Sequence, residues 1–466
     1  MSDNFELAAL KLRLRSAPDA ALLKPLGIEA VELGSNALDR LPELAARFAA
    51  ARGPIALLTD SVPKRRETTD LLSAIDERLA GRLEFRLAAL DAQSHRVHAD
   101  RETLEHAKDM VAGATCLVTV GSGTLVDIGK AVSAAHGDIP HIAVQTATSV
   151  NGFADDQSVL LVEGVKRTTP TRYPDALIAD AETLVGAPPP LNLAGVGDLL
   201  AMFTAPADWM LAAELGMADS FAPSAVSMVR SHGEAVLAAA PRLTAGDPSA
   251  ATFIAKALTL SGISMGVAGT TAPASGMEHT VSHLIEMAMN KRGLDAALHG
   301  AQVGVSTIVS ALLWDKVRTH LRTRAQLAYP TAGEMEGRVH DAFGELDPTG
   351  AMADECWRLY SRKLARWTAN RERTAALDLS EVAARVAPLL SPPGNLVESM
   401  AVAGGPVRFG ALEPPAEPEL VRWALENCHL MRDRFTVADL AFLLGIWTRT
   451  HVQDLLAEVA ALGGGL

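Results

Sequence analysis

Two histidines stand four residues apart in the segment SGMEHTVSHLIEM, residues 275 to 287. A helix places residues i and i+4 on one face, so His279 and His283 would point the same way, with Glu286 one turn further along. The spacing is close to the zinc-protease signature H-E-x-x-H, whose mechanism needs a glutamate directly after the first histidine. Thr280 occupies that position, which argues against a metalloprotease. By itself such a pair is more often two histidines on the surface or in the core of an ordinary helix.

A catalytic zinc site takes about three protein ligands and keeps one position open for water or substrate. Asp198 follows the turn AGVG and His299 precedes Gly300, and we expect each at the start of a helix, where a turn can present a side chain to a cleft. With His279 they would form an Asp/His/His set. His283 would then be left for a contact with substrate or with a ligand. Spacing alone does not select these residues from the 13 histidines of the chain.

The segment TCLVTVGSGTLVDIGKAVSAA is typical of a strand, a glycine turn and a helix in succession. Gly121 and Gly123 permit a tight turn, and the N–H groups that begin the helix could bind a phosphate or pyrophosphate. Val126 stands where the third glycine of G-x-G-x-x-G would be, and the segment does not match a Walker A loop. An ordinary turn is therefore an alternative.

A second polar turn, TATSVNGFADD, follows the next strand along the chain. Its polar residues are Thr146, Thr148, Ser149, Asn151 and Asp155. Ligands of parallel α/β sheets bind at the carboxyl ends of the strands. Such residues also form plain turns, but two neighbouring polar strand ends that face one crevice favour a nucleotide site.

Asp60 ends the apolar run IALLTD. An acidic side chain at that place can accept hydrogen bonds from the adenine ribose and repel a 2′-phosphate, which favours NAD over NADP. The segment PKRR comes directly afterwards, and Lys64, Arg65 and Arg66 could instead bind a phosphate or form a solvated face. Both interpretations stay open at this point.

Short β-rich runs alternate with helical patterns over the first 180 residues. The predicted strands are 54–60, 84–91, 115–120, 141–146, 158–162 and 176–180, and the clearest predicted helices are 65–79 and 103–112. This alternation predicts a parallel α/β layer. Beyond that region long amphipathic helical patterns continue to the end. We therefore predict a Rossmann-like nucleotide-binding domain over residues 1–182 and an all-helical metal- and substrate-binding domain over residues 183–466.

The composition limits the classes of partner. The net charge of −13, without long basic runs, argues against nucleic acid and anionic membranes. The three cysteines are too few for a disulfide framework. The amino-terminal segment has no apolar core of a secretory signal, and the longest uncharged run, 257–277, is broken by Gly, Ser, Thr and Pro. We expect a soluble cytoplasmic protein that forms a homo-oligomer.

Five segments in order carry a resemblance to a known family: VGSGTLVDIGK, TATSVNGF, LAGVGDLLAMFTAPADW, SGMEHTVSH and LHGAQVGV. With the late segment ENCHLMRDRFTVADL, they resemble the glycerol-1-phosphate dehydrogenase family, within the superfamily of dehydroquinate synthase-like and iron-containing alcohol dehydrogenases. The resemblance covers most of residues 50 to 310 and resumes near 420 to 445, whereas residues 315 to 420 match poorly.

The resemblance implies a cofactor site and a metal site. The positions that match contacts to NAD, or to NADP, are Gly121, Ser122, Gly123, Thr124, Leu125, Thr146, Ala147, Thr148, Ser149 and Asp155. Asp198, His279 and His299 match the ligands of a divalent metal, for which we expect zinc, with nickel or iron as alternatives. Asn151, Asp198 and His283 match substrate-binding positions. Asp198 and His283 are the predicted catalytic residues.

The implied reaction interconverts dihydroxyacetone phosphate and sn-glycerol 1-phosphate, with the metal as a Lewis acid and His283, or a water that it orients, as the proton donor. The loop VKRTTPTRYP offers Lys166, Arg167 and Arg172 to the substrate phosphate, although basic loop residues are often only solvated.

Two departures from the family concern the substrate and the turn: Asn151 stands where the family usually has Asp, and Ser122 replaces the middle glycine of three. The alternatives are another polyol or alcohol dehydrogenase, a dehydroquinate synthase-like cyclase, and a binding protein without catalysis.

Overall fold

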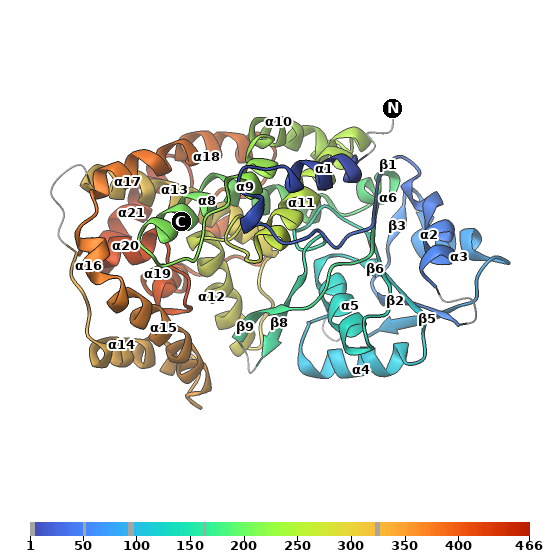
Figure 1. The fold of residues 1–466 in the computed structure, drawn as a ribbon, viewed down its shortest axis with the longest axis horizontal. Helices are drawn as coiled ribbons and strands as arrows, with labels where there is room; N and C mark the ends of the chain where they lie inside the picture. Colours follow the sequence, from blue (N-terminus) through green and yellow to red (C-terminus); the bar gives the residue numbers. More distant parts are fainter. Residues whose placement is uncertain (1–4, 50–52, 92–96, 163–164, 322–326) are drawn as a thin grey trace. The chain divides into compact units, whose positions relative to one another are not determined.

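The computed structural model describes residues 5–49, 53–91, 97–162, 165–321 and 327–466 (Figure 1). The chain forms two compact units. The first unit consists of Met1–Val162, Lys166–Leu199 and Ser227–Thr270, and the second unit of Glu163–Val165, Leu200–Val226 and Thr271–Leu466. The start of the amino-terminal segment, residues 1–4, lies outside the described part.

A six-stranded sheet forms the centre of the first unit, in the order β1-β10-β7-β6-β2-β5. Every neighbouring pair in it is parallel. The strands are β1 (Ala30–Gly34), β2 (Ile55–Asp60), β5 (Phe85–Leu90), β6 (Cys116–Gly121), β7 (His141–Gln145) and β10 (Ala176–Asp180). Gly121 pairs with Gln145 in the register, so the two predicted polar strand ends are neighbours at the carboxyl edge.

Helices cover both faces of this sheet (Figure 1). On one face the core joins α2 (Leu41–Phe48) and α3 (Leu71–Leu79) to the strands, and on the other it joins α4 (Arg101–Val111) and α5 (Gly123–Ala135). The remaining helices of the first unit are α1 (Leu7–Arg15), η1 (Ala20–Leu22), η2 (Ala37–Arg40), α6 (Ala181–Val185), α7 (Pro189–Leu199), α10 (Gly233–Thr244) and α11 (Pro248–Ala268). Among the described helices, α11 is long and apolar enough to cross a membrane, but most of its apolar stretch is buried, as in a core helix.

The structure corrects two of the secondary-structure elements predicted from the sequence. The predicted strand 158–162 lies outside the main sheet, because β8 (Gln157–Val162) forms a separate two-stranded sheet with β9 (Val165–Pro170). The predicted helix 65–79 begins later, since β3 (Arg65–Arg66) and β4 (Thr69–Asp70) form an antiparallel hairpin first. Asp70 then caps α3 by accepting a hydrogen bond from Ser73 N, which fixes where the helix starts.

The second unit is helical from Leu200 onward in its described residues. Its helices are η4 (Leu200–Phe203), α8 (Ala205–Glu214), α12 (Met277–Lys291), α13 (His299–Leu321), α14 (Ala332–Gly344), α15 (Ala351–Ala369), α16 (Arg371–Ala375), α17 (Leu379–Val386), η5 (Ala387–Leu389), α18 (Pro393–Val402), η6 (Phe409–Ala411), α19 (Pro418–Asn427), η7 (Cys428–Leu430), α20 (Val437–Leu443) and α21 (Arg449–Ala461). Residues of both units belong to α9 (Pro223–Arg230). The predicted fold class, a parallel α/β layer followed by helices, is confirmed.

The last strand of the sheet ends at Asp180, close to the boundary predicted at residue 182. The first compact unit nevertheless extends beyond residue 182. It contains Lys166–Leu199 and Ser227–Thr270 together with the sheet. The division into a nucleotide-binding and a metal-binding domain at residue 182 therefore stays a prediction.

Candidate active site

Three imidazole rings of the second unit cluster where α12 meets the start of α13. The ring centroids of His279 and His299 are 5.2 Å apart, those of His283 and His299 5.3 Å, and those of His279 and His283 6.3 Å. His279 and His283 are each only 5% exposed. The ligand atoms of His283, Glu286 and His299 lie within 4.8 Å of one another, close enough to hold one cation. The HxxxH spacing therefore does bring these side chains to one place.

Each ring is oriented through its Nδ1 atom by a different partner. His279 Nδ1 donates to Glu278 Oε1 at 3.0 Å, which leaves the lone pair of the neutral ring on Nε2. His299 Nδ1 lies 3.0 Å from Ser282 Oγ. A guanidinium N–H of Arg432 donates to His283 Nδ1 at 2.5 Å, so the neutral ring of His283 carries its proton on Nε2. His279 is thus prepared to accept at Nε2 and His283 to donate.

Two buried carboxylates support the amino terminus of α12. Glu278 Oε1 accepts from Gly276 N at 2.5 Å, and Glu278 Oε2 accepts from Thr204 Oγ1 at 2.9 Å. Asp208 accepts from Met277 N at 2.9 Å. Burial, and secondarily the charge of Glu278, raise the pKa of Asp208 well above its usual range. These contacts fix the helix end that presents the first histidine.

Gly276 is required at this helix start for steric reasons. A Cβ atom there would lie 2.6 Å from Asp208 Oδ2, closer than real Cβ atoms come, and would make a tight contact of 3.0 Å with Glu278 Oε2. Gly276, which precedes α12 in the sequence, therefore helps to hold the start of the helix that carries His279.

Asp198 and Asn151 meet in the first unit. Asp198 is 1% exposed, and its Oδ2 accepts from Asn151 N at 2.8 Å. The Asn151 amide Nδ2 donates to Ser261 Oγ at 3.1 Å.

Asp198 lies near the end of α7 and not at a helix start as predicted, because the helix already begins at Pro189. His299 does begin a helix, as predicted.

The glycine turn has the predicted strand–turn–helix form. β6 ends at Gly121, α5 begins at Gly123, and Ser122 stands between them at the N-cap. A Cβ on Gly123 would lie 2.4 Å from Val150 Cγ2, so the backbone packs too closely for a side chain there. The N–H groups that begin α5 lie next to the end of β7, and a helix start of this kind suits an anion.

Unsatisfied buried polar atoms lie at the same edge. Gln145 is fully buried, and neither its Oε1 nor its Nε2 has a hydrogen-bond partner among the described residues. The same holds for Ser149 Oγ. Buried polar groups are nearly always paired, so these atoms indicate a bound ligand or water. Thr148 is already paired, because its Oγ1 and its N–H both donate to Asn192 Oδ1, at 3.0 and 2.9 Å.

Comparisons with known proteins identify the family. Residues 32–188 match the family described as iron-containing alcohol dehydrogenase. A relative from Bacillus licheniformis, named glycerol-1-phosphate dehydrogenase [NAD(P)+], is 31% identical over 93% of this chain and 93% of its own length. The chain belongs to the glycerol-1-phosphate dehydrogenase family. A relative of the same name from Methanothrix thermoacetophila is 36% identical over 44% of this chain, a match that spans 58% of that relative's length.

A solved structure supports the fold of this family member. The probable glycerol dehydrogenase from Sinorhizobium meliloti aligns with a TM-score of 0.58 at 16% identity, over 93% of this chain and 96% of that one. At that identity the likeness shows the fold alone.

Several predicted site residues of this family member have structural partners. Arg172 donates to both carboxylate oxygens of Asp175, each at 2.8 Å, and to the carbonyls of Asp138 and Ile139, each at 2.7 Å. These contacts hold the chain beside β7, and a contact of Arg172 with a substrate phosphate stays a prediction. Asp60 Oδ1 accepts from Val62 N at 3.0 Å and pairs with the Lys64 ammonium.

Asp155 is one partner of a lysine that the sequence analysis missed. The Lys130 side chain is fully buried, and its Nζ lies 2.6 Å from Asp155 Oδ1 and 3.0 Å from Asp127 Oδ1. It also donates to Gly152 O at 2.8 Å. Lys130 therefore holds the turn between β7 and β8, and a cofactor contact of Asp155 stays a prediction.

The sequence analysis also missed four other residues of the candidate site, namely Glu278, Asp208, Arg432 and Gln145. For Glu278 the sequence carried a signal, since an acid beside a candidate ligand histidine is a common supporting group for a metal site. For the others no local pattern existed.

Proposed function

We propose that this chain is a metal-dependent, NAD(P)-linked dehydrogenase that interconverts dihydroxyacetone phosphate and sn-glycerol 1-phosphate. The observation that carries the proposal is the imidazole cluster, in which one ring presents a lone pair and its neighbour presents a proton. The printed names of the relatives, glycerol-1-phosphate dehydrogenase [NAD(P)+], supply the substrate and the cofactor. We also retain the prediction of a cytoplasmic homo-oligomer.

The proposed metal ligands are Asp198, His279 and His299. The described side chains fit a divalent metal, because His279 and His299 are each hydrogen-bonded at Nδ1, by Glu278 and by Ser282, as metal-binding imidazoles usually are. Nitrogen and carboxylate donors suit zinc, and nickel or iron are alternatives. When bound, the metal would supply Lewis-acid polarisation of the substrate carbonyl.

The proposed steps of the protein itself concern orientation and the proton. The proposed proton donor to the substrate oxygen is His283 Nε2–H, and Arg432 holds the ring in the tautomer that can donate from Nε2. The proposed nucleotide site is the edge formed by the Gly121–Leu125 turn and the Thr146–Ser149 segment. The unpaired Gln145 amide and Ser149 hydroxyl support a ligand there.

The test is the reduction of two ketones with NADH by the purified metal-loaded protein. We expect kcat/KM for dihydroxyacetone phosphate to exceed that for dihydroxyacetone by at least about 100-fold, because a site built for a charged group loses paired interactions when the group is absent. A ratio near one with good turnover would replace the proposal with a general polyol dehydrogenase. No change in NADH absorbance with either ketone would favour a cyclase or a binding protein.

A further inference from the structure

We propose that Lys363 of α15 is a positioning residue of the candidate active site. It holds residues 428–436, here called the Arg432 segment, in the place from which Arg432 donates to His283 Nδ1 at 2.5 Å. The inference rests on the proposed function, in which His283 donates the proton. Lys363 belongs to the part of the chain, residues 315–420, that resembles the family poorly. The inference therefore gives a residue of this region a role in the reaction.

Lys363 reaches the backbone on both sides of Arg432. The Lys363 side chain is 4% exposed, and its Nζ donates to His429 O at 2.5 Å and to Arg434 O at 3.2 Å. The third partner of Nζ is Asp439 Oδ1, at 2.6 Å. An ammonium group has three N–H donors, so these three acceptors can use all of them. One side chain of α15 thus fixes the chain before and after the arginine.

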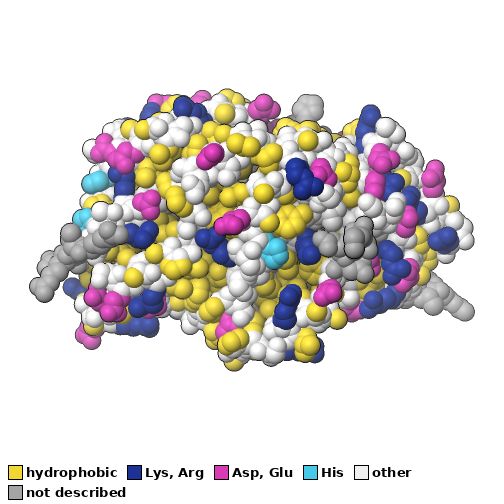
Figure 2. All heavy atoms as spheres, turned by 90° about the horizontal axis from the view of Figure 1, so that it is seen from above, with side chains coloured by type: hydrophobic (Ala, Val, Ile, Leu, Met, Phe, Trp, Pro, Cys, Tyr) yellow, Lys and Arg dark blue, Asp and Glu magenta, His cyan; other side chains and the backbone are white. Residues whose placement is uncertain are grey.

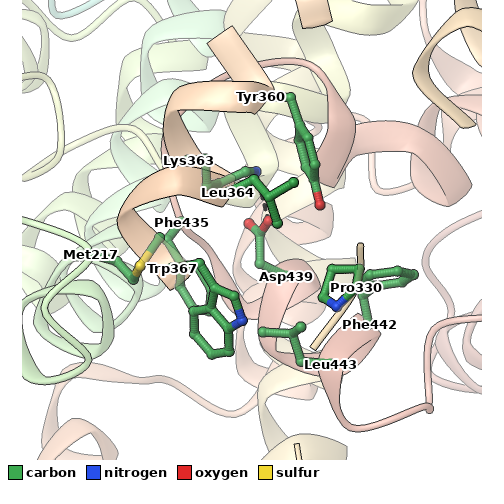
Figure 3. Close-up of a pocket in the computed structure, with 10 residues that line it drawn as sticks. All are labelled: Met217, Pro330, Tyr360, Lys363, Leu364, Trp367, Phe435, Asp439, Phe442 and Leu443. Atoms are coloured by element: carbon green, nitrogen blue, oxygen red, sulfur yellow. Dashed lines mark hydrogen bonds and ion pairs between the residues drawn. The ribbon is translucent and has the colours of Figure 1, made fainter. Parts of the chain in front are cut away.

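Asp439 balances the charge of Lys363 and fixes the start of the next helix. Its side chain is 6% exposed, and Figure 3 shows the ammonium and the carboxylate pointing toward each other beside a cavity of about 20 Å³, room for about one water molecule. Asp439 Oδ2 also accepts from Thr436 N at 2.8 Å, in the capping box of α20. Because the pair is buried, bulk water cannot readily replace the contacts of the ammonium.

Arg434 and Val437 anchor the carboxyl-terminal end of the Arg432 segment. The Arg434 guanidinium donates to Ser275 O, in the chain that precedes α12. The Val437 N–H, just beyond the segment, donates to Asp208 Oδ1 of α8 at 3.0 Å. Lys363 adds an anchor on the amino-terminal side of the arginine. Its loss should therefore free that side of the segment while the other anchors remain.

The first experiment is a double-mutant cycle of Lys363→Met and Arg432→Met, with kcat for dihydroxyacetone phosphate and NADH as the readout. We expect Lys363→Met to lower kcat about 10-fold when Arg432 is present, the effect of one misplaced charge-assisted hydrogen bond. In the Arg432→Met background the same change should lower kcat by less than about 2-fold, because Lys363 acts through Arg432. KM for NADH and the metal content should stay unchanged. Equal losses in the two backgrounds would overturn the inference and leave the dehydrogenase proposal intact.

A second variant separates positioning from stability. Lys363→Met leaves the Asp439 carboxylate buried without its cation, which should lower the unfolding midpoint. In Lys363→Met/Asp439→Asn that charge is gone and the amide oxygen can still accept from Thr436 N, so part of the midpoint should return. We expect kcat to stay as low as in Lys363→Met. Recovery of kcat together with the midpoint would make Lys363 a purely structural residue. The control is Lys316→Met, which removes a partly exposed lysine paired with Glu458 and should change neither quantity.

The tautomer of His283 gives a readout that does not require turnover. Nitrogen NMR of the metal-loaded wild type should show His283 with an unprotonated Nδ1, and His283→Ala identifies the signal by its loss. In Lys363→Met we expect a mixture of the two tautomers, and in Lys316→Met the wild-type spectrum. A wild type that reduces neither ketone would reject the proposed dehydrogenase. The NMR comparison then decides the inference by itself: a changed tautomer in Lys363→Met supports it, and an unchanged tautomer overturns it.

Discussion

His279 and His283 differ in the group behind each ring, and this difference supports the roles proposed for them. A carboxylate behind an imidazole makes the ring a better metal ligand and selects the tautomer with a lone pair on Nε2. Glu278 supplies this carboxylate to His279. Arg432 can only donate, so it selects the opposite tautomer in His283. The helix spacing shows that two histidines share a face, but it cannot show which one binds metal.

We therefore expect His279→Ala and His299→Ala to lose bound metal and His283→Ala to keep it. Removal of one of about three ligands should lower metal occupancy and reduce turnover by at least about 100-fold. His283→Ala should reduce turnover with little change in metal content, because only the proton donor is lost. Elemental analysis of the dialysed proteins measures this directly, with the half-exposed His340→Ala as the control.

An equal loss of metal from His283→Ala would contradict the proposed set. It would favour the alternative set of His283, Glu286 and His299, whose ligand atoms lie within 4.8 Å of one another.

At the scale of the elements, a buried histidine joins β7 to β6. His141 is fully buried, and its Nε2 lies 2.7 Å from Thr119 Oγ1 on the neighbouring strand. A Cβ on Gly129 of α5 would lie 2.8 Å from the same Nε2, so the helix packs directly over this pair. Burial, with the charges of Arg172 and Lys130, lowers the pKa of His141 to about 3.

This lowered pKa predicts a stability that falls in mild acid. Between the native pKa of about 3 and the ordinary value of 6.5, the unfolded chain binds a proton that the native state does not. The stabilisation is therefore fully present above pH 6.5 and is lost as the pH falls toward 3. At pH 5 the titration of His141 lowers the free energy of unfolding by about 2 kcal/mol relative to neutral pH. Denaturant unfolding at pH 7.5 and pH 5 should show His141→Gln losing less stability than the wild type. Equal losses in both proteins would mean that His141 does not control the acid sensitivity.

Local patterns predicted most of the sheet, because buried parallel strands are continuous apolar runs between turns. They missed β1, a five-residue strand that pairs with β10 at the edge of the sheet, and they placed β8 in the wrong sheet. They also missed Arg432, which meets a histidine 149 residues away. Such a contact depends on the tertiary fold, so no spacing within a segment can predict it.

At the scale of the whole molecule, charge bears on the choice of cofactor. The chain has 55 acidic residues against 42 Lys and Arg, and on the face in Figure 2 the two kinds are interspersed. NADPH carries a 2′-phosphate that adds nearly two negative charges at neutral pH. The nearby PKRR cations are partly neutralised, since Lys64 pairs with Asp60 and Arg66 with Asp180 and Glu182. Repulsion by the net charge should therefore outweigh attraction by this segment.

We expect the wild type to use NADH more efficiently than NADPH and the preference to shrink as ionic strength rises. The Debye length falls from about 30 Å at 0.01 M salt to about 8 Å at 0.15 M, so added salt screens the repulsion of the extra phosphate by distant acids. Asp60→Gly should narrow the gap already at low salt, because it removes one negative charge and releases the Lys64 ammonium from its ion pair. The measurement is kcat/KM for both cofactors across this range, with Asp39→Gly, an exposed acid on η2, as the control. A wild type that prefers NADPH, or a preference that salt does not change, would show that contacts with the PKRR segment decide the cofactor instead.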